Sequence, residues 1–441
     1  MPVVAALLYW LRLARRTIDP RLKRGHAGGF TVVAGAAVVT AVWIWQRPGG
    51  LADAYFWGEV AGVEAIYVMC CSLLVATRAR VLEPWFGGLD RMYLWHKRTA
   101  IAGVALLVPH KLLLDAAPDE QAGPLGLALG VGSAIGLIVL VVVSVPRAAR
   151  LLRLSYERWL SAHRMTGLFV AIGIVHGLLL DRVLASSVLL QVVFGVVGAT
   201  GMAAYLYAEL VMRRAAPAAD YQVAVVTRPD DTSLELVLEP GGLPLTPRAG
   251  QFVFLAVGGP GAGREHPFSV AGTGPGGELR LLIRARGADT RRLHDQLRPG
   301  VPARVTGPYG MFDHTLGGDR QVWIAGGLGV VPFLAWLDDP ASARHDAIDF
   351  FYSASSPADA HYLPEMTAAV GRIPGLRLHT VFTDSQPRLT AAAVVAAIDG
   401  RVADRHVFLC GPATMTEALN RGLRRYGVAR DHLHAEQFSF R

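Results

Sequence analysis

Four histidines lie in apolar stretches that are long enough to cross a membrane. His96 and His110 share one such stretch, and His163 and His176 share another. An ionisable side chain inside a bilayer is costly and usually faces the interior of a helix bundle, so each of the four is a candidate functional residue. The chemistry open to a buried imidazole is metal ligation, proton transfer or hydrogen bonding between helices.

The spacing of these histidines indicates two depths in the membrane. His96 and His110 are fourteen residues apart, close to four turns, so both rings lie on nearly one helix face about 21 Å apart. That separation fits within a hydrocarbon core about 30 Å thick. His163 and His176 are thirteen residues apart, so they match the first pair in depth but not in face. We therefore expect either a distortion of the second helix near Gly167, Gly173 or Gly177, or a rotation of the group that His176 holds.

Two facing helices with this spacing would present two opposed pairs of imidazoles. A flat metal macrocycle held by one imidazole on each side suits such a pair, because haem iron accepts axial histidines and an apolar bundle excludes water. We interpret His96, His110, His163 and His176 as ligands of haem iron in two stacked haem b groups. Interhelical hydrogen bonding and a proton relay remain alternatives for any single histidine. Zinc suits the pattern less well, because its ligands converge on one point.

Six apolar runs would carry these histidines through the bilayer. Each is near the roughly 20 residues that a crossing needs, and they cover 30–46, 58–77, 92–114, 124–145, 159–180 and 186–212. An even number of crossings places both ends of the chain on the same side. Arginine and lysine are concentrated before the first run, between the second and third, and between the fourth and fifth, so the positive-inside rule places both termini in the cytoplasm. A lipid bilayer is thus an expected partner, and richness in alanine, glycine and arginine favours a bacterial inner membrane.

Composition excludes several other classes of protein. Of the 441 residues, 52% are hydrophobic and 18% charged, and much of the net charge of +8 flanks the apolar runs. No nucleic-acid motif accompanies that charge, so we expect no nucleic-acid partner. Residues 1–29 favour an amphipathic cytoplasmic segment over a secretory signal, because their positive charges follow the apolar run. Three cysteines are too few for an iron–sulfur cluster or a disulfide framework.

Beyond residue 212 the sequence is typical of soluble protein. Short strand-like segments between glycine and proline turns predict an antiparallel β-barrel over 217–312. Alternating strands and helices over 319–441 predict a doubly wound, mostly parallel α/β domain. The segments expected as strands are YQVAVVT, TSLELVLE, FVFLAV, ELRLLIRAR and ARVTG in the first region, and VWIAG, AIDFFYSA, LRLHTVF and HVFLCG in the second.

Four short motifs in this half are suited to nucleotide cofactors. HPFS at 266–269 combines an aromatic ring with hydrogen-bonding groups that suit a flavin. GADT at 287–290 opens a predicted helix, whose free N–H groups suit a pyrophosphate. GGLGVVP at 326–332 follows a predicted strand, where glycines allow close approach to a dinucleotide, and CGP at 410–412 ends a later strand at the same edge. Each motif alone is weak, because ordinary strands and turns produce similar sequences.

The order and spacing of these motifs, with GPYG at 307–310 and EQF at 436–438, resemble the ferredoxin-NADP reductase superfamily. With the four histidines added, the chain resembles the NADPH oxidase and ferric reductase family, in which a ferric reductase-like transmembrane domain is fused to a ferredoxin-NADP reductase-type FAD/NAD(P) module. The resemblance implies a six-helix di-haem membrane domain at 30–212, an FAD-binding β-barrel at 217–312 and a Rossmann-like NAD(P)-binding domain at 319–441.

The resemblance also assigns cofactor-binding residues. The flavin ring would be contacted by His266, Pro267, Phe268 and Ser269, and the FAD phosphates by Arg284, Gly287 and Thr290. Val270 and Gly307 are further expected cofactor-binding residues. The nicotinamide nucleotide would lie between Gly326, Gly327, Gly329 and Pro332 on one side and Cys410, Gly411 and Pro412 on the other. Glu436 and Phe438 match the closing motif whose aromatic covers the flavin, although Phe440 is an alternative for that aromatic. Ser269, Cys410 and Phe438 would stand nearest the hydride transfer.

The expected function follows from electron counting. A nicotinamide gives up two electrons as hydride and haem iron takes one at a time, so a flavin is needed between them. We expect a transmembrane oxidoreductase that moves electrons from cytoplasmic NADPH or NADH through FAD and the haem pairs to O2 on the far side, giving superoxide. The serines of SASSPAD at 353–359 leave the choice between NADPH and NADH open. Alternatives are a ferric-chelate reductase, electron delivery to a periplasmic partner protein, and a transport protein whose histidines only form hydrogen bonds.

Overall fold

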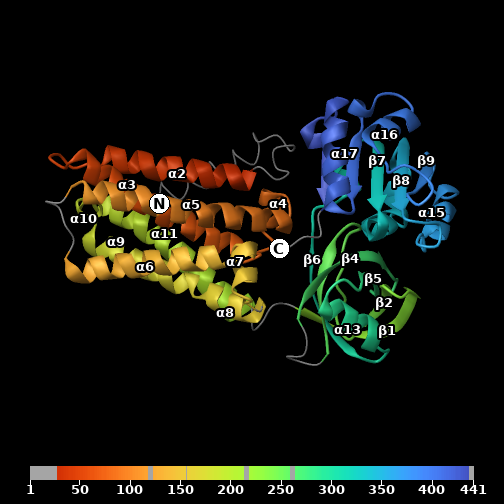
Figure 1. Ribbon diagram of the computed structural model, residues 1–441, viewed down its shortest axis with the longest axis horizontal. Coiled ribbons are helices and arrows are strands. Elements are labelled where there is room, and N and C mark those ends of the chain that lie inside the picture. Colours follow the sequence, from red (N-terminus) through yellow and green to blue (C-terminus); the bar gives the residue numbers. More distant parts are fainter. Residues whose placement is uncertain (1–26, 118–122, 155, 213–217, 259–263, 437–441) are drawn as a thin grey trace. The chain divides into compact units, whose positions relative to one another are not determined.

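The computed structural model describes residues 27–117, 123–154, 156–212, 218–258 and 264–436 (Figure 1). The chain divides into two compact units, Met1–Ala216 and Pro217–Arg441, each of which is described by itself. Most of the predicted amphipathic segment at 1–29 lies outside the described residues, and so does Phe438.

The described part of the first unit is helical, because apolar segments satisfy their own backbone hydrogen bonds only as helices in lipid. Figure 1 shows its long helices running alongside one another. The helices are α2 (Ala27–Trp45), α3 (Asp53–Ala76), α4 (Glu83–Phe86), α5 (Leu89–Asp115), α6 (Pro124–Val143), α7 (Pro146–Leu151), α8 (Tyr156–Arg164), α9 (Thr166–Leu180), α10 (Arg182–Ala185) and α11 (Val188–Leu206), followed by the π-helix η2 (Tyr207–Met212).

Five helical segments among the described residues are long and apolar enough to cross a membrane. They are Ala27–Trp45, Asp53–Ala76, Pro124–Val143, Arg158–Leu180 and Val188–Met212. The sixth predicted crossing, at 92–114, falls in α5. That helix has 27 residues, but charges such as Lys97, Arg98 and Lys111 make it less apolar than the other five. The count of six crossings therefore stays a prediction.

The surface of the first unit is suited to lipid. Val33, Ile101, Ile135 and Val192 come from four different helices, and each is more than half exposed. An apolar surface of this extent favours a membrane environment, because soluble monomers rarely expose contiguous apolar patches of such size. The interior is packed around side chains such as Trp43, which is fully buried.

The second unit begins with a closed antiparallel barrel, as the sequence predicts, but it has a sixth strand, at His266–Thr273, besides the five predicted segments. Its strands are β1 (Ala218–Asp230), β2 (Ser233–Pro240), β3 (Phe252–Val257), β4 (His266–Thr273), β5 (Leu279–Arg284) and β6 (Pro302–Tyr309), in the order β1-β2-β5-β4-β3-β6. Helix α13 (Ala288–Gln296) connects β5 to β6. Leu236, Leu281 and Val305 are fully buried in the barrel core. The HPFS motif opens β4, which places it at one end of the barrel.

A five-stranded parallel sheet follows, in agreement with the predicted α/β domain, although its assignment as Rossmann-like stays a prediction. The strand order is β11-β10-β7-β8-β9. The strands are β7 (Arg320–Gly326), β8 (Ala347–Ala354), β9 (Leu376–Phe382), β10 (His406–Cys410) and β11 (Leu433–Glu436). The helices are α14 (Val331–Leu337), α15 (Leu363–Val370), α16 (Ala391–Ala397) and α17 (Ala413–Arg425), with the 3-10 turns η3 (His314–Leu316), η4 (Gly327–Val330), η5 (Pro340–Arg344), η6 (Val402–Asp404) and η7 (Arg430–His432).

Both faces of this sheet are buried. Along β7, Val322 and Ile324 pack into one apolar cluster, whereas Trp323 and Ala325 pack into another. Alternate side chains of a strand point to opposite faces, so the two clusters cover the two sides of the sheet. The chain reverses its direction of winding between β7 and β10, and ligands of open α/β sheets bind outside the carboxyl ends of the strands at such a point.

Candidate functional site

The four membrane histidines form two facing pairs in the first unit. The ring centres of His96 and His163 are 5.9 Å apart, and the two rings are almost perpendicular, at 84°. The ring centres of His110 and His176 are 6.2 Å apart, at 88°. The helices therefore bring together the same two pairs that the sequence predicts.

Every one of these rings has a hydrogen-bond partner at Nδ1 from a neighbouring helix. His110 and His176 each lie 2.8 Å from a main-chain carbonyl, that of Gly58 and that of Gly126. Within the part of the chain that the structure describes, no hydrogen bond is recorded for Nε2 of any of the four rings. The Nε2 atoms are thus the atoms left for a ligand.

The partners of the other two rings are serines. Nδ1 of His96 lies 2.8 Å from Ser72 Oγ and 3.1 Å from the Ser72 carbonyl oxygen. Nδ1 of His163 lies 3.2 Å from Ser144 Oγ, and the Ser144 hydroxyl donates its own proton to the carbonyl of Leu140 at 2.7 Å.

These partners fix which ring nitrogen carries the proton. A carbonyl oxygen only accepts, so Nδ1 of His96, His110 and His176 must be the donor. The hydroxyl proton of Ser144 is already committed, so Nδ1 of His163 must also donate. All four imidazoles therefore hold their proton at Nδ1 and present the Nε2 lone pair, which is the arrangement that metal-ligating histidines adopt when a second group orients them.

The separation within each pair fits one metal ion held between two rings. Imidazole nitrogens bind metal ions such as zinc at about 2.0 Å, and each nitrogen lies roughly 1 Å from its ring centre, so a bridging ion sets the ring centres about 6 Å apart. No group of three or more His, Cys, Asp or Glu that could hold a metal ion occurs among the described residues. A haem needs only two ligands from the protein, and each of the two histidine pairs could supply two.

The pairing of α3 with α5 explains why the histidines of α5 have partners at both depths. Gly58 and Ser72 are fourteen residues apart on α3, as are His96 and His110 on α5, and the two helices are antiparallel. On the other side the helix breaks at Met165, between α8 and α9. This break lies between the two histidines and close to Gly167, where the thirteen-residue spacing predicts a distortion.

Two glycines make room for the rings of His110 and His176. A Cβ atom on Gly62 would lie 2.7 Å from Nδ1 of His110, and a Cβ atom on Gly130 would lie 2.6 Å from Cε1 of His176. Both distances are below those of real Cβ contacts, so any larger residue would push the ring out of place. Glycine at these positions is therefore part of the site.

In the second unit, the predicted nucleotide residues meet at the carboxyl edge of the parallel sheet. A Cβ atom on Gly329 would lie 2.3 Å from the carbonyl oxygen of Cys410, and one on Gly411 would lie 3.1 Å from Cα of Gly326. Glu436 is the register neighbour of Cys410 on the next strand. The two glycine-containing loops thus touch at the point where the sheet reverses its winding, which is the expected position for a dinucleotide.

The thiol of Cys410 is fully buried. Burial raises the pKa of this thiol, and the neighbouring charge of Glu436 raises it further. A thiol in such surroundings stays protonated at neutral pH and is a poor nucleophile.

The predicted flavin residues lie at the opening of β4 and the start of α13. Ser269 is buried, and among the described residues its Oγ has no hydrogen-bond partner. Nε2 of His266 lies 3.3 Å from a carboxylate oxygen of Asp289, and Thr290 Oγ1 accepts from the N–H of Gly287 at 3.0 Å. A buried hydroxyl without a partner costs free energy, so Ser269 fits a site that a polar ligand completes.

Several other predicted cofactor-binding residues have no hydrogen bond or ion pair to Ser269, His266 or Thr290 among the described residues. Val270 lies in the barrel core, Pro332 in the first turn of α14, and Gly307 in β6. Arg284 ends β5, and its Nη1 lies 3.9 Å from the point where a Cβ atom on Gly327 would stand. The remaining predicted residues are Pro267 and Phe268 in β4 and Pro412, which precedes α17.

Sequence reasoning misses the residues that orient the histidines. Gly58, Ser72, Gly126 and Ser144 carry no motif, because three of them act through main-chain carbonyls. A signal was present in α3, where Gly58 and Ser72 repeat the fourteen-residue spacing of the α5 histidines. Trp159 is also missed, and its indole is stacked on the His163 ring, with centres 5.1 Å apart at 18°.

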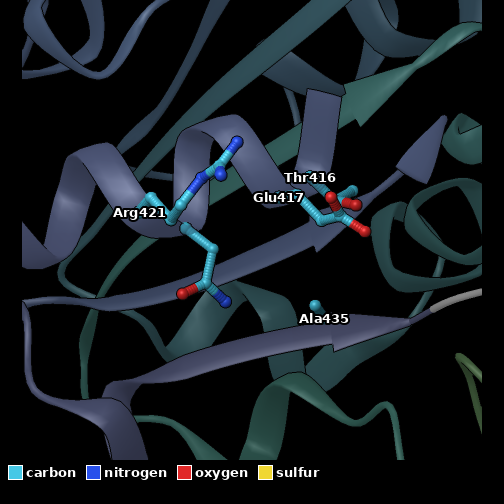
Figure 2. Close-up of a pocket in the computed structure, with 5 residues that line it drawn as sticks. Thr416, Glu417, Arg421 and Ala435 are labelled. Atoms are coloured by element: carbon cyan, nitrogen blue, oxygen red, sulfur yellow. The ribbon is translucent and has the colours of Figure 1, made fainter. Parts of the chain in front are cut away.

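A hollow of about 200 Å³ lies on the second unit. Figure 2 shows that Thr416, Glu417 and Arg421 of α17 lie above Ala435 of β11 there. Asn420 completes its lining. None of the residues predicted to bind FAD or the nucleotide lines this hollow, although Thr416 donates to the carbonyl of Pro412.

Comparison with known proteins supports the two halves separately. Residues 61–174 match the family model "Ferric reductase like transmembrane component". The matched stretch contains three of the four histidines and ends two residues before His176.

The relatives found among curated proteins are reductase components. The chain is 30% identical over 220 residues to the ferredoxin–NAD(+) reductase component of the alkene monooxygenase system of Xanthobacter autotrophicus, covering 46% of this chain and 65% of that one. It is 29% identical over 163 residues to the carnitine monooxygenase reductase subunit of Escherichia coli, covering 36% and 48%. The chain therefore spans less than two thirds of the length of these relatives.

Solved structures resemble this chain only with TM-scores below 0.5 in the two examples that follow. The cytochrome P450 reductase GcoB of Amycolatopsis is 25% identical, with a TM-score of 0.43, and the match covers 50% of this chain and 69% of that one. The flavohemoglobin of Malassezia yamatoensis is 15% identical, with a TM-score of 0.49 over 96% of this chain and all of that one. The fold assignment therefore stands on the topology described above. The chain joins a ferric reductase-like transmembrane component to a module of the ferredoxin-NADP reductase type.

Proposed function

We propose that this protein is a transmembrane oxidoreductase that passes electrons from NAD(P)H, through FAD and two bis-histidine haem b groups, to an acceptor on the far side of the membrane. The proposal rests on the two facing pairs of imidazole rings. Ring centres at 5.9 and 6.2 Å, with the free Nε2 atoms left by the Nδ1 hydrogen bonds, suit one iron atom in each pair.

The proposal requires α5 to cross the membrane as the sixth helix. Its charges are concentrated near its two ends, at Lys97 and Arg98 on one side and Lys111 on the other. It lies antiparallel to α3, which is apolar enough to cross, and contacts it at both Gly58 and Ser72. A helix that pairs with a crossing helix along this length shares its depth in the bilayer.

The cofactors supply the redox chemistry: FAD converts the two-electron donor to single electrons, and haem iron carries them one at a time. The residues of this chain bind and orient those groups. The buried Ser269 hydroxyl is free to bind the flavin ring, and Gly326, Gly329 and Gly411 let the two loops of the proposed nucleotide site meet next to Cys410. Both termini would lie in the cytoplasm, as the positive-inside pattern predicts, so the His96–His163 pair would be the inner one.

O2, giving superoxide, is the acceptor that we propose first. Two histidines would hold each iron, so the acceptor would be reduced without binding to the metal. A ferric chelate is an alternative acceptor that the same edge would serve, and the matched family model is described as ferric reductase-like.

A second candidate function is electron delivery to a partner enzyme. The relatives include reductase components of an alkene monooxygenase system and of a propane 2-monooxygenase. A protein of this kind would have neither O2 nor iron as its physiological acceptor. Slow turnover with both acceptors, in spite of rapid reduction of the haems by NAD(P)H, would favour this function.

An anaerobic absorbance spectrum before and after addition of NADPH or NADH tests the proposal. We expect a Soret band in the purified full-length protein and sharpened b-type bands after reduction. In the presence of O2, dye reduction that superoxide dismutase inhibits would identify superoxide, and dismutase-insensitive reduction of a ferric chelate would identify the alternative acceptor.

Substitution of the ligands provides the control. His110→Leu and His176→Leu should each remove one of the two haems, because one imidazole alone does not hold the iron from both sides. If either variant kept the haem content of the wild-type protein, the ligand assignment would be wrong.

A further inference from the structure

His163 differs from the other three membrane histidines in the group that accepts its Nδ1 proton. His96, His110 and His176 each lie within 3.1 Å of a main-chain carbonyl oxygen. For His163 the structure gives one acceptor, the side-chain oxygen of Ser144, at 3.2 Å. A main-chain acceptor survives any side-chain substitution, whereas this one does not.

The oxygen of Ser144 is shared between two donors. It lies 3.2 Å from Nε1 of Trp159, which donates to it, and 3.2 Å from Nδ1 of His163. Its own proton goes to the carbonyl of Leu140. The same Trp159 is stacked on the His163 ring, so Ser144 and Trp159 together hold this imidazole by an edge and a face. No stacked tryptophan is recorded for the other three histidines among the described residues.

We propose that Ser144 and Trp159 are positioning residues that orient His163 and set the redox midpoint of the haem that it shares with His96. The inference deepens the proposed function and rests on it, because it takes His163 as an iron ligand. It assigns the control of one haem, and not of the other, to two side chains that no motif marks.

The physical reason is that the hydrogen bond at Nδ1 tunes the ligand atom at Nε2. An acceptor at Nδ1 raises the basicity of a metal-ligating imidazole. A more basic ligand stabilises the more highly charged ferric iron relative to the ferrous form. Loss of the acceptor should therefore favour the ferrous form and move the midpoint to a more positive potential.

Ser144→Ala removes the acceptor without adding volume. At a fixed potential we expect the ratio of ferrous to ferric iron at this haem to rise by roughly threefold to tenfold, which is about 30 to 60 mV for a one-electron couple. The measurement is an anaerobic redox titration of the full-length holoprotein, followed in the visible haem bands and fitted to two components. One component should move and the other should stay.

Trp159→Phe tests the same assignment with the opposite sign. The phenyl ring keeps an aromatic face on His163 but no longer donates to Ser144, so the Ser144 oxygen becomes a better acceptor for Nδ1. We expect the same component to move to a more negative potential, by less than Ser144→Ala moves it the other way. General damage to the site would not reverse the direction between the two variants.

The chain offers two matched controls. Ser133→Ala removes a buried serine from α6, the helix that ends just before Ser144, and the Ser133 hydroxyl donates to the Phe169 carbonyl. Ser72→Ala removes the hydroxyl next to His96 but keeps the Ser72 carbonyl at 3.1 Å. Neither variant should move a midpoint as far as Ser144→Ala does, and Ser144→Thr should restore the wild-type value.

The outcomes separate this inference from the proposed function. A wild-type protein without a Soret band would overturn both. Two haems at full content with both midpoints unchanged in Ser144→Ala, or both shifted equally, would overturn the positioning role alone. If Ser144→Ala lost one haem and Ser144→Thr regained it, the role would be supported by haem content. If Ser144→Ala did not fold, the direction of the shift in Trp159→Phe would decide.

Discussion

Gly62→Ala should expel the haem that we propose for the His110–His176 pair while leaving the helix intact. The added Cβ atom would stand 2.7 Å from Nδ1 of His110, and ordinary contact begins at 3.4 Å, so the ring has to retreat by about 0.7 Å. That shift is about a third of a metal–imidazole bond of about 2.0 Å. Displacing an orienting contact of this kind typically lowers metal affinity by about 10- to 100-fold. We therefore expect haem content to fall from two per chain towards one.

The substitution itself should not destabilise the helix. Alanine is favoured over glycine inside a helix by about 1 kcal/mol, so Gly62→Ala should unfold no more easily than the wild-type protein. Gly132→Ala in α6 is the matched control, because a Cβ atom there meets nothing within 4 Å. The assay is haem per protein by the pyridine haemochrome method, together with thermal unfolding. Retention of two haems in Gly62→Ala, or an equal loss in Gly132→Ala, would refute the reasoning.

Three further predictions concern the second unit. Ser269→Ala should weaken FAD binding by about fivefold, the worth of a hydrogen bond of about 1 kcal/mol, and FAD release measured by fluorescence would show it. Burial raises the pKa of Cys410, so a thiol reagent at neutral pH should label this residue after unfolding and not before; labelling of the folded protein would contradict its burial. Burial lowers the pKa of both His314 and His345 below the 6.5 of an exposed imidazole, so the unfolded chain takes up more protons as the pH falls. The free energy of unfolding should therefore decrease between pH 7 and 5, and His314→Gln should flatten that dependence in denaturant titrations.

Much of the fold follows from local patterns in the sequence. The segment AIDFFYSA is rich in apolar and aromatic residues, as strands of a buried parallel sheet are, and it forms β8 with the same bounds, Ala347–Ala354. The facing of His96 with His163 also follows, because an imidazole in an apolar helix has to turn away from lipid. Such features depend on the chemistry of each residue and not on its distant neighbours.

The orientation of the histidines depends on contacts that no local pattern encodes. The carbonyl of Gly126 reaches His176 from a residue fifty positions earlier in the chain. Any residue can supply a main-chain carbonyl, so its type gives no signal. Because of its charges, α5 is not among the helices that are apolar enough to cross a membrane. Its contacts with α3 show that the two helices run alongside each other. The closing aromatic, Phe438, lies outside the described residues.

The antiparallel pairing of α3 with α5 fixes the distance between the two candidate haem positions. Both helices measure the same fourteen residues between their contacts. One residue inserted between Gly58 and Ser72 would turn the helix by about 100° and lengthen it by about 1.5 Å, so at least one imidazole would lose its acceptor. Changes of length in this hairpin can therefore persist only in compensating pairs, which makes insertions and deletions here far less tolerable than substitutions on the lipid-facing surface.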